Sequence, residues 1–177
     1  MSVKPVHTIQ LLILAIVGII CSCYVHAQTT PSTPQVCADL SVKLVSFEKN
    51  ISEKGKDLTI YVFNAPAVAK ELKKSIGTQI GKSKIVAVIE GTALPVNKPD
   101  IIFIGNTQQA LKAVKYARTN SVLSVCNDVE IANLGATVCI AQSDSENKPY
   151  VSISANASHE ENLEWNPAIF KWVRSTR

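Results

Sequence analysis

Histidine and methionine are scarce in this chain of 177 residues, which contains three histidines and one methionine. Beyond residue 27 only His159 remains, in a polar stretch where two glutamates follow it. A Ser-His-Asp triad would have to use this histidine, and a zinc hydrolase helix needs a second histidine four residues further on. The sequence therefore offers no catalytic residue, and we do not expect the protein to be an enzyme.

Cysteine is too sparse for a metal site. Residues 28–177 contain three cysteines and no Cys-x-x-Cys pair, whereas a structural zinc site takes about four cysteine or histidine ligands. We expect no metal and no cofactor.

Glycine, proline and net charge are also low. Seven glycines and eight prolines are too few for a collagen-like or linker-dominated chain. The formal charge is +4, from 18 basic and 14 acidic residues without a long basic tract, so nucleic acid is not an expected partner. Because 46% of the residues are hydrophobic and the length is that of one domain, we expect a single globular unit.

Residues 1–27 contain a single fixed charge, Lys4, which precedes an apolar run over 11–20. That run is shorter than the ~20 residues that cross a bilayer, and Ala27 supplies a small residue for cleavage. These features predict a secretory signal peptide over 1–27 and export from the cytoplasm. An uncleaved N-terminal anchor and a lipoprotein modified at Cys23 are the alternatives.

Proline- and threonine-rich residues 28–35 predict a flexible tether, followed by one domain over 36–177. Apolar residues at helical spacing predict a helix over 37–50, with a strand as the alternative. A second helix is expected over 65–76, with Asn64 as its cap and Gly77 at its end. Further helices are expected through 110–117, over 129–134 and from 166 onward. Ile76 and Leu111 are among the residues expected to face the core.

Runs rich in β-branched residues predict strands. They lie at 58–63, 84–89, 100–104, 121–125, 136–141 and 150–154. Strand–helix–strand alternation indicates a three-layer α/β fold, with a mostly parallel mixed sheet of about six strands flanked by helices. The last two strands are expected to form a C-terminal antiparallel hairpin, and the strand at 100–104, apolar on both faces, is expected at the centre of the sheet.

Polar residues follow several of these strands at their carboxyl ends, where α/β sheets bind small ligands. They are Asn64, Gly105, Asn106, Thr107, Asn127 and Asp128. The same residue types cap helices and form turns, so the sequence leaves ligand binding and capping as alternatives.

The three cysteines beyond the leader allow several oxidation states. Cys126 and Cys139 lie on successive predicted strands, close enough for a disulfide if those strands are neighbours. Three reduced and buried thiols, or a pair that uses Cys37, are the alternatives. An unpaired Cys37 would also allow an intermolecular bridge, and with it a homodimer.

The order of several local runs resembles the YfiR family of periplasmic proteins. The matching runs are LTIYVF at 58–63, DIIFIG at 100–105, SVLSV at 121–125 and LEWNPAIFK at 163–171. The resemblance implies a periplasmic regulator in cyclic-di-GMP signalling that binds the extracytoplasmic part of an inner-membrane signalling protein, a diguanylate cyclase or a sensor kinase, and modulates its activity. It also implies that disulfide chemistry links the protein to redox state. A periplasmic sensor that binds a small molecule, of unknown identity, is the alternative function.

Candidate contacts for such a partner come from two groups of residues. Lys70, Lys73 and Lys74 lie on the second predicted helix and suit an acidic partner, although such a face is also typical of a solvated helix. Trp165 and Trp172 are near the C-terminal end, and tryptophan is common at interfaces, although core packing would also explain them.

Overall fold

The computed structural model describes residues 32–143 and 148–176, so the predicted signal peptide lies outside the described residues. The helices are α2 (Pro34–Val45), α3 (Lys49–Ser52), α4 (Pro66–Leu72), α5 (Ala110–Asn120), α6 (Val129–Asn133) and α7 (Ala155–Glu160), with 3₁₀ helices η2 (Lys73–Ser75) and η3 (Pro167–Lys171). The strands are β1 (Asp57–Phe63), β2 (Gln79–Ile80), β3 (Ser83–Gly91), β4 (Ile101–Ile104), β5 (Leu123–Cys126), β6 (Val138–Gln142), β7 (Pro149–Ser154) and β8 (Arg174–Thr176).

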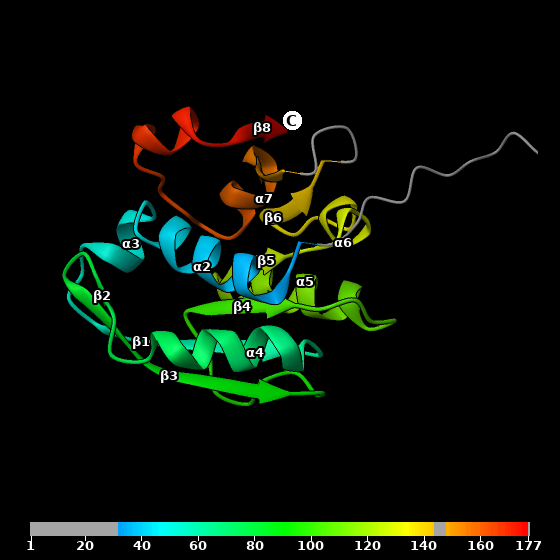
Figure 1. Ribbon diagram of the computed structural model, residues 1–177, viewed down its shortest axis with the longest axis horizontal. Helices are drawn as coiled ribbons and strands as arrows, with labels where there is room; N and C mark the ends of the chain where they lie inside the picture. Colours follow the sequence, from blue (N-terminus) through cyan, green and yellow to red (C-terminus); the bar gives the residue numbers. More distant parts are fainter. Residues whose placement is uncertain (1–31, 144–147, 177) are drawn as a thin grey trace, which may run out of the picture.

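The eight strands form one sheet in the order β2-β3-β1-β4-β5-β6-β7-β8 (Figure 1). Strands β3, β1, β4, β5 and β6 run parallel, while β2 and β7 pair antiparallel with β3 and β6. This arrangement confirms the predicted α/β fold, the mostly parallel sheet and the antiparallel pair near the C-terminal end. Strands β2 and β8, of two and three residues, were not predicted.

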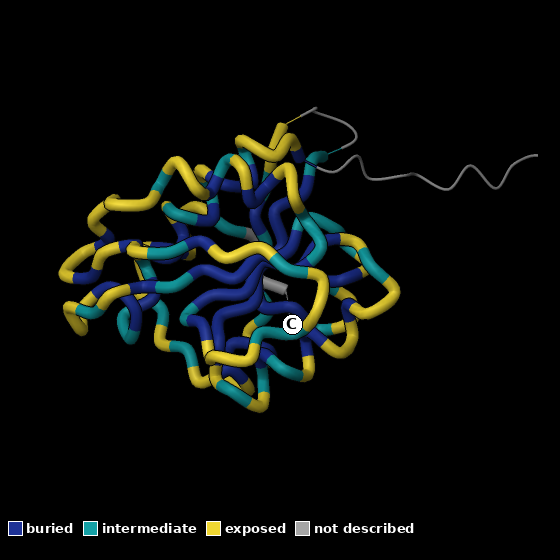
Figure 2. The backbone as a smooth tube through the Cα atoms, turned by 90° about the horizontal axis from the view of Figure 1, so that it is seen from below, coloured by how far each residue is buried: buried dark blue, intermediate teal, exposed yellow. Residues whose placement is uncertain are grey.

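Each face of the sheet has its own hydrophobic core. One core includes residues of α2 and α4, and the other includes residues of α5 and α6. Strand β4 contributes to both, because Ile101 and Phe103 face the first core while Ile102 and Ile104 face the second. All four are buried, which confirms the predicted central strand, and Figure 2 shows the buried strands enclosed by more exposed segments.

Helix α2 differs from its predicted range at both ends. It begins at Pro34, within the stretch expected to be a tether, because the Thr33 hydroxyl accepts a hydrogen bond from the Val36 amide (3.4 Å) and proline suits the first helical turn. It ends at Val45, and the chain turns into the separate helix α3. The buried Glu48 begins this second helix, because its carboxylate accepts a hydrogen bond from Ile51 N (2.6 Å) and caps α3.

Asn64 does not cap α4, so that prediction is wrong. Its backbone adopts a left-handed conformation (φ 53°), and Ala65 occupies the cap position without a side-chain hydrogen bond. Asparagine tolerates this conformation better than most residues. Pro66 does begin the helix, as predicted, and Gly77 has a positive φ just beyond η2.

The chain between β7 and β8, which we call the C-terminal segment (residues 155–173), contains the short helix α7 and the 3₁₀ helix η3. Helix α7 was not predicted, and η3 takes the place of the helix expected from residue 166, with the Asn166 side chain as its cap. Ile169 of η3 is buried in the same core as α2 and α4, so this segment covers the same face of the sheet (Figure 1).

Candidate functional site

The structure gathers the predicted strand-end residues at the carboxyl edge of the sheet, where they contact one another in pairs. Asn64 donates to the Thr107 hydroxyl (3.4 Å), and Asn106 donates to the Asp128 carboxylate (2.7 Å). Asp128 also caps α6 by accepting a hydrogen bond from Glu130 N (2.8 Å). These contacts give the edge a structural role.

Gly105 follows β4 at this edge and packs closely against the turn after β1. A Cβ atom at this position would lie 2.3 Å from the Asn64 carbonyl oxygen. Asn127, the remaining residue of the predicted set, is partly buried near the Cys37 thiol, where its side chain acts against the rise in the thiol's pKa that burial causes.

A cavity of about 680 Å³ lies beside this edge, at the ends of β1 and β3. Its lining includes one residue of the predicted set, Asn64, together with Lys73 and Glu90. The Lys73 ammonium and the Glu90 carboxylate form an ion pair across 3.3 Å. The cavity therefore presents one charge of each sign beside a strained asparagine.

The predicted disulfide is absent, because Cys37, Cys126 and Cys139 are all free and buried. Cys126 and Cys139 are direct partners on the parallel strands β5 and β6. The strand spacing of ~4.8 Å lies within the Cα separation that a disulfide allows, so the two strands are neighbours as the prediction required, while the two thiols remain unbonded. A hydrogen bond with Cys139 and then burial raise the pKa of the Cys126 thiol. Burial raises the pKa of Cys37 to about 11.

The predicted lysines lie on α4 and η2, at the surface of the protein. Lys73 and Lys74 are ion-paired, with Glu90 (3.3 Å) and Glu71 (2.5 Å), and Lys70 is exposed. A groove of about 340 Å³ separates these helices from α2, with Asp39 and Val42 on its α2 side.

The two tryptophans lie on the C-terminal segment. Trp165 is half-buried, and its indole N–H donates to the Ser158 hydroxyl (2.9 Å). Trp172 is 64% exposed, with the Lys43 ammonium 4.0 Å from the centre of its ring, and Phe170 is 53% exposed. We call Trp165, Phe170 and Trp172 the aromatic patch. Phe170 and Trp165 also line an apolar cavity of about 230 Å³.

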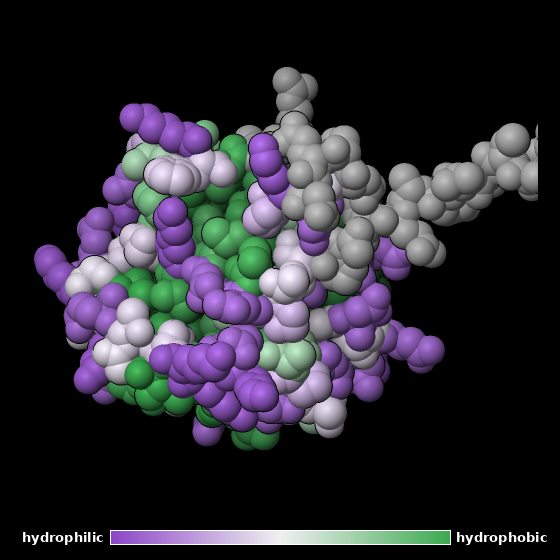
Figure 3. Space-filling model, in the orientation of Figure 1, coloured by the Kyte–Doolittle hydropathy of each residue, from purple (hydrophilic) through white to green (hydrophobic). Residues whose placement is uncertain are grey.

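The lysines, the groove and the aromatic patch belong to one side of the molecule, which we call the helical face: α4 with η2, α2 and the C-terminal segment. Figure 1 shows these elements side by side on the near side of the sheet. In Figure 3, apolar side chains gather around α2 and the C-terminal segment, whereas hydrophilic side chains cover α4. The structure therefore brings both predicted contact groups onto one surface.

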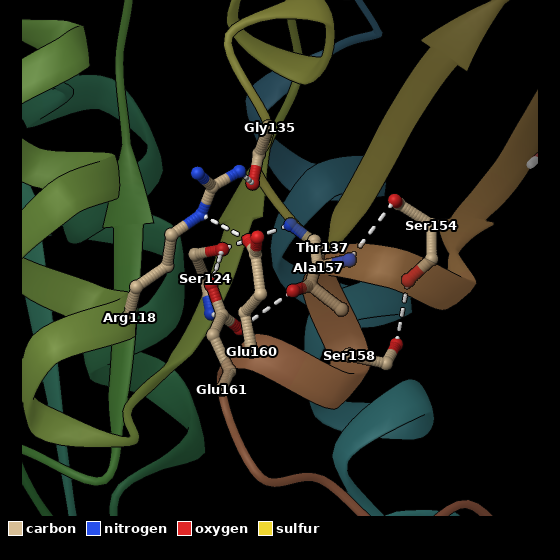
Figure 4. Close-up of polar contacts among 9 residues, drawn as sticks. All are labelled: Arg118, Ser124, Gly135, Thr137, Ser154, Ala157, Ser158, Glu160 and Glu161. Atoms are coloured by element: carbon tan, nitrogen blue, oxygen red, sulfur yellow. Dashed lines mark hydrogen bonds and ion pairs between the residues drawn. The ribbon is translucent and has the colours of Figure 1, made fainter.

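Sequence reasoning missed two buried glutamates. Glu161 has no exposed surface, and its carboxylate accepts hydrogen bonds from Ser124 N (3.0 Å), from the Ser124 hydroxyl and from the Thr137 hydroxyl (2.6 Å) (Figure 4). Burial raises its pKa to about 7, although these hydrogen bonds and the nearby Arg118 act in the opposite direction. Its position just after His159 and Glu160 gave no signal, because its partners lie on β5 and before β6.

Glu48 is the second buried glutamate, and it also has no exposed surface. In addition to capping α3, its carboxylate accepts a hydrogen bond from Glu164 N (2.8 Å). Its backbone forms an isolated antiparallel bridge with Trp165, next to an ion pair between Lys49 and Glu164 (2.6 Å). Both buried glutamates therefore attach the C-terminal segment to the rest of the protein.

Within residues 32–143 and 148–176, no group of three or more His, Cys, Asp or Glu side chains could hold a metal ion. The same residues contain no helix with the length and apolar character that crossing a membrane requires.

Comparison with known proteins identifies structural neighbours and a family. One neighbour is the crystal structure of a conserved domain protein from Vibrio cholerae O1 biovar eltor, with a TM-score of 0.55 and 15% sequence identity. The match covers 84% of this chain but only 62% of the Vibrio chain, and at this identity it shows a shared fold alone. No curated protein matches the sequence. The YfiR/HmsC-like family model matches residues 34–173, which is most of the chain and the whole of the helical face, and the protein therefore belongs to the YfiR/HmsC-like family.

Proposed function

We propose that this protein is a periplasmic, non-enzymatic regulator that binds the extracytoplasmic part of an inner-membrane signalling protein, a diguanylate cyclase or a sensor kinase, through its helical face. Family membership supports the class of function. The observation that carries the binding surface is the aromatic patch, in which Phe170 and Trp172 are more than half exposed. Exposed aromatic anchors are typical of the few residues that dominate binding energy at interfaces.

The charge of the helical face indicates the character of the partner. Lys43 beside Trp172, Lys70 on α4 and Lys171 at the end of η3 are exposed basic residues around the patch and the groove, where Asp39 and Glu164 are exposed acidic residues. We therefore expect an acidic contact surface on the partner, and association that becomes slower as salt concentration rises.

A crosslinked pull-down from native membranes tests this proposal. The wild-type protein should recover a membrane diguanylate cyclase or sensor kinase, and the double variant Phe170→Ala/Trp172→Ala should recover at least tenfold less, because loss of an interface anchor typically costs about 2 kcal/mol or more. Leu134→Ala is the matched control, since Leu134 is also an exposed apolar residue (41%) but follows α6, on the opposite face of the sheet. Equal recovery by all three proteins would refute the helical face as the binding surface.

Periplasmic location is part of the proposal and has its own test. Cell fractionation with N-terminal sequencing should find the mature protein in the periplasm, starting at Gln28. An intact N-terminus in the membrane fraction would support the anchor instead, and a lipid-modified Cys23 the lipoprotein.

The cavity beside β1 and β3 favours a second candidate, a sensor that binds a small molecule. A thermal-shift screen of anions, nucleotides, sugars and amino acids addresses it, with Asn64→Ala as the variant. A compound that stabilises the wild type but not the variant would support this function, and the absence of any stabilising compound would count against it.

A further inference from the structure

The C-terminal segment carries the aromatic patch, and its attachment to the sheet depends on a carboxylate with no exposed surface. Glu161, at the end of α7, accepts hydrogen bonds from the Ser124 amide and hydroxyl on β5 and from the Thr137 hydroxyl just before β6. One side chain therefore ties the segment to two strands (Figure 4). If the segment detached, this carboxylate would enter water.

The charged groups around Glu161 are largely engaged with other partners. On one side, the Arg118 guanidinium contacts Glu160 (2.7 Å) and the Gly135 carbonyl (3.2 Å). On the other, Glu161 lines a cavity of about 210 Å³ whose charged residues are Glu48, Lys54, Lys56, Lys98 and Asp100. Lys56 is paired with Asp100 (2.6 Å). Among the ion pairs of the described residues, none includes Glu161.

Burial without a directly paired cation favours the protonated form of a carboxyl group, whereas hydrogen bonds donated to it favour the ionised form. The three hydrogen bonds of Glu161 offset part of the cost of its charge, and burial outweighs them. The same carboxyl group has its ordinary pKa when the segment is detached, so detachment releases about half a proton at pH 7 and nearly a whole proton between pH 5.5 and pH 6.

We propose that the C-terminal segment is a strap that takes up a proton at Glu161 when it docks onto the sheet, so that acid tightens the strap and alkali loosens it. The direction follows from the charge balance: the docked form binds more protons than the detached form, so its stability falls as pH rises.

The size of the effect follows from the two states of this carboxyl group. Burial raises its pKa to about 7 in the docked strap, against 4.5 for an ordinary glutamate. Between pH 5 and pH 8 the docking equilibrium should therefore weaken by about 70-fold, a change concentrated below pH 7.

The consequence for the aromatic patch rests on the proposed function. Trp165, Phe170 and Trp172 all lie on the strap. A partner that recognises the docked arrangement would bind more tightly at acid pH. Proton-linked docking of the strap itself requires no partner.

Hydrogen–deuterium exchange of the full protein at pH 5 and pH 8, corrected for intrinsic exchange rates, tests the proposal. Protection of residues 155–173 in the wild type should fall by up to about 70-fold between these pH values. Glu161→Gln, which is neutral at both, should remove this difference. Glu164→Gln is the matched control, because Glu164 belongs to the same strap but is exposed and ion-paired with Lys49, and it should retain the difference.

Equal protection of the strap at both pH values in the wild type, or an unchanged difference in Glu161→Gln, would overturn the proposal. If Glu161→Gln does not fold, a pH titration of the wild type followed by the ¹³C carboxyl resonance of Glu161 decides. A titration midpoint near pH 7 supports the strap, and a midpoint near pH 4.5 refutes it. Neither readout uses a partner. If the pull-down fails but protection of the strap depends on pH, the proposed function is refuted and the strap proposal stands.

Discussion

Glu48 connects three parts of the protein at the scale of a single residue. Its carboxylate accepts hydrogen bonds from Ile51 N (2.6 Å) and Glu164 N (2.8 Å), while the residue itself follows α2. It therefore holds α3 and the C-terminal segment in fixed positions relative to α2.

Replacement of Glu48 by alanine should lower the free energy of unfolding by about 2–4 kcal/mol, because two amide groups would lose their partner in a buried site. Urea denaturation measures this change. Glu53→Ala, at an exposed position just after α3, is the control and should change stability by less than ~0.5 kcal/mol. A midpoint for Glu48→Ala equal to that of the wild type would contradict the role of the carboxylate.

The thiols give a second prediction at this scale. Burial raises the pKa of Cys37, and the hydrogen bond with Cys139 followed by burial raises that of Cys126. Because the thiolate is the reactive form, both cysteines should react with iodoacetamide at pH 7.5 far more slowly in the native protein than in urea. Mass spectrometry should find free thiols at all three positions after unfolding without reductant. A Cys126–Cys139 disulfide in protein isolated from the periplasm would disagree with the structure and restore the redox hypothesis.

Apolar residues were easier to predict than polar ones. All four residues of β4 are apolar, and successive side chains of a strand face opposite sides of the sheet. The sequence therefore predicts that β4 contacts a hydrophobic core on each face, as it does. Ile76 and Leu111 were expected in the core but are exposed. Helix η2 ends before Ile76, and Leu111 lies outside the stripe of α5 that is buried, which consists of Ala110, Ala113, Val114 and Ala117. Glu161 and one of the two contacts of Glu48 depend on donors more than 20 residues distant, which no local pattern reveals.

At the scale of secondary-structure elements, the turn after β1 and the turn after β4 are in direct contact. The chain leaves β1 through Asn64 in a left-handed conformation, and Gly105 leaves β4 against the Asn64 carbonyl. These two turns direct α4 to one face of the sheet and α5 to the other.

Gly105→Ala should therefore destabilise the protein by about 2–3 kcal/mol or more, since the added Cβ would meet backbone atoms that cannot move independently. Gly77→Ala is the comparison, because Gly77 has a positive φ (93°) but open space around its Cα, and its cost should be about 1 kcal/mol. Thermal denaturation of both variants measures the difference. The reverse order of stabilities would show that the two turns can separate without cost.

At the scale of the whole molecule, the two cores share the same strands. Because β1, β4, β5 and β6 have buried side chains in both cores, neither face can lose its packing without affecting the other. The class of fold was predictable for the same reason, since strands apolar on both faces require helices on both. The path of the C-terminal segment was not, because its short helices are held by buried polar contacts.

We expect unfolding at pH 5 to be a single transition in which far-UV circular dichroism and tryptophan fluorescence coincide. Both tryptophans lie on the C-terminal segment, so their fluorescence reports on this segment while circular dichroism reports on the entire fold. Two separate midpoints at pH 5 would show that the segment is not part of the cooperative unit under acid conditions.

The strand order has a consequence for how the polypeptide acquires its shape. After β1, the hairpin of β2 and β3 adds to one margin, and β4 through β8 then join the other margin one after another, in the order of the sequence. No strand has to slip between two that are already paired. A chain released from its N-terminal end onward could thus build its sheet by successive addition, without taking apart any pairing that it has already made.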